Sequence, residues 1–100
     1  MGVTRVIRYT TKPEHAEENA RLIRDVFAEL AATRPAGLRY DAYRLADGVG
    51  FMHVVEIEGP DNPLAGLGSF AAFQAGIDER CSDGPTPTDA GVVGSYSSGT

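Results

Sequence analysis

The stretch FMHVVEIE at residues 51–58 decides the fold of this chain. Side chains of a β-strand point alternately to its two faces, and one face of this strand is apolar apart from a histidine: Phe51, His53, Val55 and Ile57. The opposite face begins with Met52 and Val54 and becomes acidic toward the end of the stretch. A strand that is apolar on both faces is covered on both faces. The stretch therefore predicts a central strand between two layers.

The length of the chain limits where the second covering layer can come from. One hundred residues form one domain, so we expect a single domain over residues 1–100. A hydrophobic content of 42% and a charged content of 23% are typical of a globular domain. Because two predicted helices can cover only one face of a sheet, a second copy of the chain is the natural source of the other layer.

Three further segments predict strands and two predict helices. The strands are rich in β-branched and aromatic residues and lie at residues 3–10, 38–45 and 90–97. The helices run from near Pro13 to Arg34 and from near Leu64 to Arg80. The first helix has one apolar stripe at helical spacing, formed by Ala16, Ala20, Ile23, Phe27 and Leu30. A polar, proline-containing loop is expected at residues 82–89 and a frayed tail at residues 98–100.

The order of these elements predicts an α+β fold of the ferredoxin-like βαββαβ type. Right-handed crossovers place the first and third strands in the centre of a four-stranded antiparallel sheet, with both helices on one face. The other face then carries Met52 and Val54 without cover. We therefore expect a homodimer in which two sheets pack face to face.

Charge and cysteine content exclude several kinds of partner. The net charge is −5, whereas a nucleic-acid partner needs a basic face, so we expect none. No apolar run approaches the length of a membrane span, and no membrane partner is expected. Cys81 is the only cysteine, which favours a reducing, cytoplasmic location without disulfides. The two histidines stand far apart and give no metal-ligand spacing, so no metal site is expected.

Nearly the whole chain resembles the antibiotic-biosynthesis-monooxygenase-like family. The resemblance is carried by VIRYTTKPEHAEENARLIRDVFAELAATRPAGLRYDAYRL at residues 6–45, by FMHVVEIEGPDNPLAGLGSFAAFQAGIDER at residues 51–80, and by VVGSY at residues 92–96. It implies a dimeric α+β barrel with a pocket between each sheet and its two helices. The family includes cofactor-independent monooxygenases of phenolic polyketides, quinol oxidases and haem-degrading enzymes, and we expect no cofactor. The histidine that the haem-degrading branch carries on the second helix has no counterpart here.

His53 is the candidate catalytic base. It shares a face with Phe51 and Val55, the more apolar face of the strand and so the one expected to meet the helices. A histidine in such a pocket could take a proton from a phenol or quinol near neutral pH. The alternative is a core histidine whose ring is satisfied by a backbone carbonyl or a tyrosine.

Six other residues are candidates for a ligand pocket. Tyr40 and Tyr43 fall on opposite faces of one strand, so only one of them can join His53. Phe27, Phe70 and Phe73 could line an aromatic pocket, although at helical spacing such residues often serve only the core. Arg44 could hold a carboxylate or phenolate, although a salt bridge with a sheet carboxylate competes with that role.

These features favour a small-molecule-binding protein. The first hypothesis is a cofactor-independent monooxygenase or isomerase of an aromatic or polyketide-like substrate. The second is a non-catalytic dimer that binds a small aromatic ligand in the same pocket. The third is an interaction module whose pocket is filled by its own side chains. Fold resemblance alone does not choose among them.

Overall fold

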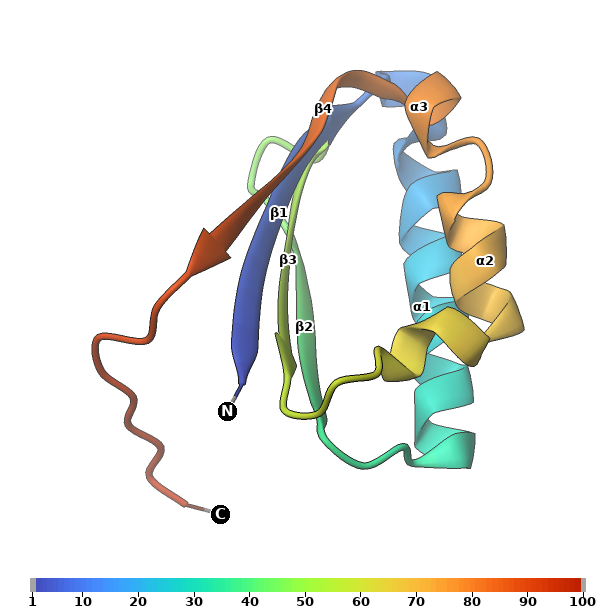
Figure 1. Cartoon of the computed structure of the whole chain (residues 1–100). Coiled ribbons are helices and arrows are strands. Elements are labelled where there is room, and N and C mark those ends of the chain that lie inside the picture. The colour runs from blue at the N-terminus through green and yellow to red at the C-terminus, as the bar shows by residue number, and fades with distance from the viewer. Residues whose placement is uncertain (1, 100) are drawn as a thin grey trace.

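The computed structural model describes residues 2–99, which form one sheet with helices on one face (Figure 1). Its four antiparallel strands lie in the order β2-β3-β1-β4, and they are β1 (Val3–Thr11), β2 (Leu38–Arg44), β3 (Gly50–Ile57) and β4 (Cys81–Ala90). The helical elements are η1 (Pro13–His15), α1 (Ala16–Thr33), η2 (Pro63–Gly66), α2 (Gly68–Gln74) and α3 (Ile77–Arg80). The predicted ferredoxin-like α+β fold is confirmed, with β1 and β3 at the centre.

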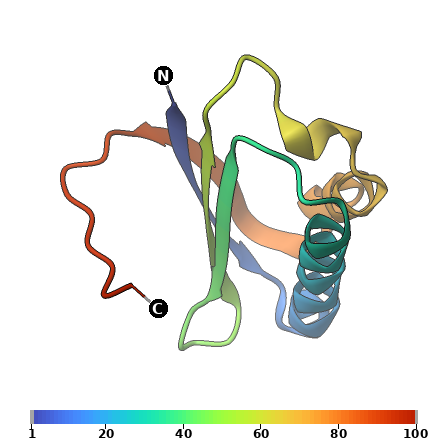
Figure 2. The same ribbon diagram turned by 90° about the horizontal axis from the view of Figure 1, so that it is seen from below.

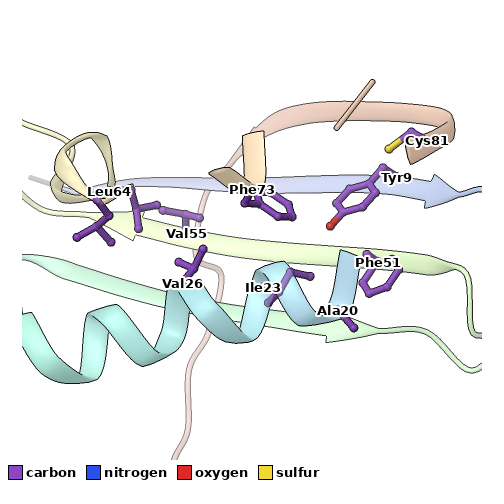
Figure 3. Packing of buried hydrophobic residues seen from close by; sticks show 10 residues of the cluster. Tyr9, Ala20, Ile23, Val26, Phe51, Val55, Leu64, Phe73 and Cys81 are labelled. Carbon is purple, nitrogen blue, oxygen red and sulfur yellow. The ribbon is translucent and has the colours of Figure 1, made fainter. Parts of the chain in front are cut away.

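The core lies between the sheet and the helices (Figure 3). Phe51 and Val26 are each only 1% exposed, and the Tyr9 ring stacks on Phe51 with the ring centres 5.5 Å apart. Every member of the predicted stripe on α1 is buried or half-buried. Full burial of an apolar side chain of this size contributes about 1.5–3 kcal/mol, so these contacts hold α1 against β3.

The second predicted helix is wrong as one continuous helix. The structure divides residues 63–80 into η2, α2 and α3. The break between α2 and α3 falls at Gly76, whose φ of 80° is a left-handed conformation that glycine adopts without steric cost. The first turn starts at Asn62, whose side chain accepts a hydrogen bond from the Leu64 amide. These breaks bend the segment over the sheet.

The predicted fourth strand is also wrong. Pairing with β1 begins at Cys81, so the expected loop at residues 82–89 is strand β4 itself. Pro85 and Pro87 are compatible with this placement because β4 is an edge strand, where a missing amide donor is tolerated. The residues predicted to form the strand mostly follow it without regular structure. They expose three large apolar side chains: Val92, Val93 and Tyr96.

The two faces of the sheet have different surroundings. Figure 2 shows α1 and α2 on one side, and the chain after β4 on the other. The face away from the helices carries Val6, Met52 and Val54, all of them half-buried. None of the described helices covers this face. Within residues 2–99, no helix has the length and apolar character needed to cross a membrane.

Candidate functional site

A cavity of about 550 Å³ lies between the sheet and the segment that runs from η2 to α3. Most of its wall is apolar or aromatic, with Ile7 and Val55 from the sheet and Phe70 and Phe73 from α2. Polar groups are few, and three of them meet on the sheet side: Tyr9, Tyr40 and His53. A cavity of this size with a few convergent polar groups is typical of a small-molecule site.

His53 is held between two tyrosine hydroxyl groups. Its Nε2 lies 2.7 Å from the oxygen of Tyr9, and its Nδ1 lies 2.6 Å from the oxygen of Tyr40. The histidine is only 3% exposed. Both ring nitrogens are therefore engaged, which agrees with the alternative in which tyrosine satisfies the ring.

The sheet register explains why the two hydroxyl groups reach one ring. His53 on β3 stands opposite Ile7 of β1 and Ala42 of β2. Tyr9 lies two positions after Ile7 on β1, and Tyr40 lies two positions before Ala42 on β2. Along β3, the two tyrosines therefore stand on opposite sides of His53. Such diagonal neighbours are within reach of aromatic side chains. The small side chain of Ala42 leaves room for this approach.

Two further buried polar residues, Asn19 and Arg80, continue the hydrogen bonds beyond Tyr9. Asn19 of α1 is fully buried, and its Nδ2 donates to the Tyr9 oxygen at 2.9 Å. Arg80 is 5% exposed, and its Nε donates to Asn19 Oδ1 at 3.1 Å. In Figure 3 the hydroxyl group of Tyr9 points away from Cys81 and into the core. Five polar side chains thus form one continuous chain, from Arg80 through Asn19, Tyr9 and His53 to Tyr40.

Burial keeps His53, Tyr9 and Tyr40 uncharged near neutral pH. Desolvation lowers the pKa of His53 to about 4, so its ring is neutral at pH 7. Desolvation also raises the pKa of the Tyr9 and Tyr40 hydroxyl groups well above the ordinary value, and the hydrogen bond from Asn19 opposes this rise at Tyr9 only in part. The site therefore offers neutral hydrogen-bonding groups to a ligand.

The structure brings together four of the seven site residues predicted from the sequence. His53, Tyr40, Phe70 and Phe73 line the cavity, and the Phe73 ring centre is 5.4 Å from that of His53. Phe27 lies outside the cavity wall and packs against the Tyr40 ring at 4.8 Å.

The remaining two predicted residues lie elsewhere. Tyr43 is 49% exposed on the opposite face of the sheet. Arg44 lies outside the cavity wall, forms an ion pair with Glu17 of α1 at 2.8 Å, and has its guanidinium 5.8 Å from the centre of the Phe51 ring. Its partner is thus a helix carboxylate and not one of the sheet.

Sequence reasoning did not assign Asn19 or Arg80 to the site. Asn19 stands three positions after Ala16 and four before Ile23, a spacing that places it on the buried face of α1. Arg80 follows Phe73 by seven positions and Ile77 by three, and the same spacing rule would have turned it inward within a continuous helix. A polar residue at a core position of a helix was the available signal.

Metal binding has no ligand cluster to support it in the described part of the chain. Residues 2–99 contain no group of three or more histidine, cysteine or acidic side chains placed to hold an ion.

No protein-family model and no curated protein matches this sequence. Solved structures do share its fold. Rv0793 from Mycobacterium tuberculosis is 19% identical, with a TM-score of 0.75 over 97% of this chain and 100% of that chain. A "putative antibiotic biosynthesis monooxygenase" from Nitrosomonas europaea is 12% identical, with a TM-score of 0.75 over 92% of this chain and 90% of that chain. A Caulobacter crescentus protein with the same description is 18% identical, with a TM-score of 0.73 over 93% and 91%. At these identities the likeness establishes the fold, which agrees with the resemblance in sequence pattern.

Proposed function

We propose that this chain, whose fold is that of antibiotic-biosynthesis-monooxygenase-like proteins, binds a small aromatic molecule in its cavity. The observation that carries the proposal is the placement of Tyr40, His53 and Tyr9 on one wall of a mainly apolar cavity of about 550 Å³. Apolar walls remove a planar ring from water, and a few fixed polar groups orient its oxygen substituent.

A ligand panel tests this function. Phenols, quinones, aromatic ketones and aliphatic carboxylates are added to the wild type, Tyr40→Phe and Tyr43→Phe in thermal unfolding. A ligand at a hundred times its dissociation constant adds about 2.7 kcal/mol, which is easily detected. We expect oxygen-bearing aromatics to stabilise the wild type and Tyr43→Phe more than Tyr40→Phe. Tyr43→Phe is the matched control because it removes the same hydroxyl group from the exposed face. Absence of a shift with every class would reject the proposal.

A catalytic role is the second candidate, favoured by the 2.6 Å contact between Tyr40 and His53 Nδ1. In a cofactor-independent monooxygenase, dioxygen would convert an activated methylene group of a phenolic substrate into a carbonyl group and water, without an external reductant. The substrate would pass a proton to the Tyr40 oxygen while Tyr40 passes its own proton to His53. This role requires Nδ1 to be free of a proton in the resting protein. Oxygen uptake by wild type and His53→Gln with anthrone-type substrates tests it, and equal rates would remove His53 from the mechanism.

We also propose that the chain forms a homodimer through the sheet face away from the helices. Support comes from the half-buried Val6, Met52 and Val54 on that face, and from Val92 and Val93 after β4, which are 63% and 103% exposed. Exposed apolar surface of this kind marks an interaction site. A specific interface would bury about 1,200 Å² or more. We infer a cytoplasmic location as well, supported by the single buried thiol of Cys81.

A further inference from the structure

The direction of the hydrogen bonds in the chain of five polar residues can be followed from its inner end. A guanidinium group has only donors, so Arg80 Nε donates and Asn19 must present its oxygen to it. The amide nitrogen of Asn19 then faces Tyr9 and donates to the hydroxyl oxygen at 2.9 Å. The contact with Arg80 therefore decides which end of the Asn19 amide is the oxygen and which is the nitrogen, an assignment that is otherwise ambiguous.

The hydroxyl hydrogen of Tyr9 has one possible acceptor among its described hydrogen-bond partners. Tyr9 and Tyr40 both line the cavity, but Tyr9 is only 5% exposed whereas Tyr40 is half-buried, so Tyr9 is the less able of the two to pair its hydrogen outside the protein. Among the described residues, the Tyr9 hydroxyl group has one hydrogen-bond partner besides Asn19, namely His53 Nε2 at 2.7 Å. If Nε2 carried the proton, the tyrosine hydrogen without a protein acceptor would be that of Tyr9, the less exposed of the two tyrosines. Tyr9 therefore donates and Nε2 accepts.

His53 Nδ1 and Tyr40 form the outer end of this hydrogen-bonded chain. Because the imidazole of His53 is neutral, one of its nitrogens carries a proton, and that nitrogen must be Nδ1 once Nε2 accepts. Nδ1 donates to the Tyr40 oxygen at 2.6 Å. The Tyr40 hydroxyl hydrogen then has no acceptor among the described hydrogen bonds, and Tyr40 lines the cavity. A ligand oxygen is the natural acceptor.

We propose that Arg80 acts through Asn19 as a positioning residue that makes the Tyr40 hydroxyl a hydrogen-bond donor toward the cavity, so that the site selects aromatic ligands carrying an acceptor oxygen, such as a ketone or quinone carbonyl. This inference rests on the proposed binding function and names its ligand class. It requires a proton on Nδ1 of His53, whereas the catalytic role requires Nδ1 to be free of a proton.

Long-range ¹H–¹⁵N correlation spectra of the two histidine rings test the direction without any ligand. His15→Gln assigns the signals of His53. In the wild type we expect Nδ1 protonated and Nε2 unprotonated. Any other resting state of the neutral ring overturns the inference, and a protonated Nε2 with a free Nδ1 would favour the catalytic candidate.

The variant Asn19→Asp should reverse the direction of the hydrogen bonds between Asn19 and Tyr40. A carboxylate only accepts, so it would take hydrogen bonds from Arg80 and from Tyr9, and Tyr9 would then accept from Nε2. We expect the proton on His53 to move from Nδ1 to Nε2 and Tyr40 to become an acceptor toward the cavity. Arg80 lies beside the new charge and would neutralise it. An unchanged protonation pattern in this variant overturns the inference.

Two further variants separate a change in hydrogen-bond direction from the effect of an added charge and from misfolding of Asn19→Asp. Asn62→Asp adds the same charge at the cavity wall while retaining the oxygen that accepts from the Leu64 amide, and it should leave the His53 pattern as in the wild type. Tyr9→Phe removes the donor to Nε2 and does not depend on the folding of Asn19→Asp. We expect it to lose the preference for a protonated Nδ1. Full retention of that preference would show that Tyr9 does not set the direction.

Ligand selection is measured with three probes of nearly the same shape: fluorenone, which accepts, carbazole, which donates, and fluorene, which does neither. Wild type should bind fluorenone about tenfold more tightly than carbazole, the effect of one hydrogen bond, and Asn19→Asp should reverse that order. Equal affinities for fluorenone and fluorene in a protein with protonated Nδ1 would overturn the ligand class. If none of the three binds, the binding function fails while the spectra still decide the direction.

Discussion

Arg80 Nε lies 3.1 Å from Asn19 Oδ1, and this contact joins the end of α3 to α1 inside the core. The same guanidinium donates to the backbone oxygens of Phe73 and Ala75 at 2.6 and 3.2 Å. Within residues 2–99, no carboxylate lies at ion-pair distance from it. The charge of Arg80 is thus balanced by oxygen dipoles of the segment it stabilises.

Replacing Arg80 by methionine should destabilise the protein by about 2–4 kcal/mol, because the buried oxygens of Asn19 and Phe73 and the partly buried oxygen of Ala75 lose their donor. Urea unfolding followed by circular dichroism measures the change. Arg24→Met on the exposed side of α1 is the matched control and should have little effect. A loss no larger than that of the control would mean that solvent replaces Arg80 without cost.

The stability of the protein should fall between pH 6.5 and pH 4 because of His53. Burial lowers its pKa in the folded state to about 4 from an ordinary 6.5, so the unfolded chain binds the proton first as the pH falls. The contribution is complete above about pH 6.5 and is lost toward pH 4, with a total of at most about 3 kcal/mol at 1.36 kcal/mol per pKa unit.

The measurement is the free energy of unfolding of wild type minus that of His53→Gln at each pH. Carboxylates common to both proteins cancel in this difference. His15→Gln removes the other, half-buried histidine and serves as the control for loss of a histidine. A wild-type curve parallel to that of His53→Gln through this range would contradict a neutral, buried ring.

Val54→Asp should dissociate or unfold the proposed homodimer, since it would place an unpaired charge in the sheet interface. Light scattering at micromolar concentration gives the mass, and circular dichroism gives the folded fraction. Ala28→Asp on the exposed surface of α1 adds the same charge and should leave the mass of the dimer unchanged. If Val54→Asp remains a folded dimer, the interface lies elsewhere.

Glu29→Gln should loosen α2 beside the cavity. The Glu29 carboxylate accepts from the hydroxyl group of Ser69 and from its amide, the latter at 3.0 Å, and these hydrogen bonds lower its pKa. An amide side chain is a weaker acceptor than a carboxylate, so exchange of the Ser69 amide hydrogen should accelerate several-fold. Glu14→Gln in η1 serves as the control. Unchanged protection of Ser69 would show that Glu29 does not hold the start of α2.

The alternation of apolar residues around His53 was sufficient to predict the central strand and its helix-facing side, but it left open whether Tyr40 or Tyr43 would approach the ring. The partners of Tyr9 were harder to foresee. Asn19 and Arg80 satisfy each other across α1 and α3, and no local pattern indicates which polar residues will be buried as a pair. The direction of the hydrogen bonds follows only once that pair is known.

The position of the fourth strand could not be predicted from the sequence for a different reason. Local β-propensity favoured residues 90–97, but pairing with β1 starts directly after α3, where the chain first returns to the sheet. The geometry of the connection therefore outweighed the composition of the segment. Likewise, η2 ends at Leu67 and α3 begins at the left-handed Gly76, so turns that the apolar spacing alone had joined into one helix are separate.

The prolines of β4 give the two edge strands of the sheet, β4 and β2, different capacities for hydrogen bonding. Pro85 and Pro87 offer no amide hydrogen, so an extended foreign peptide would find few donors along β4. The opposite margin, β2, contains no proline in LRYDAYR and can in principle pair with an incoming strand along its length. Amyloid-like growth, if the protein is driven to it, is therefore directed to β2, where Arg39, Asp41 and Arg44 supply the charges that oppose it.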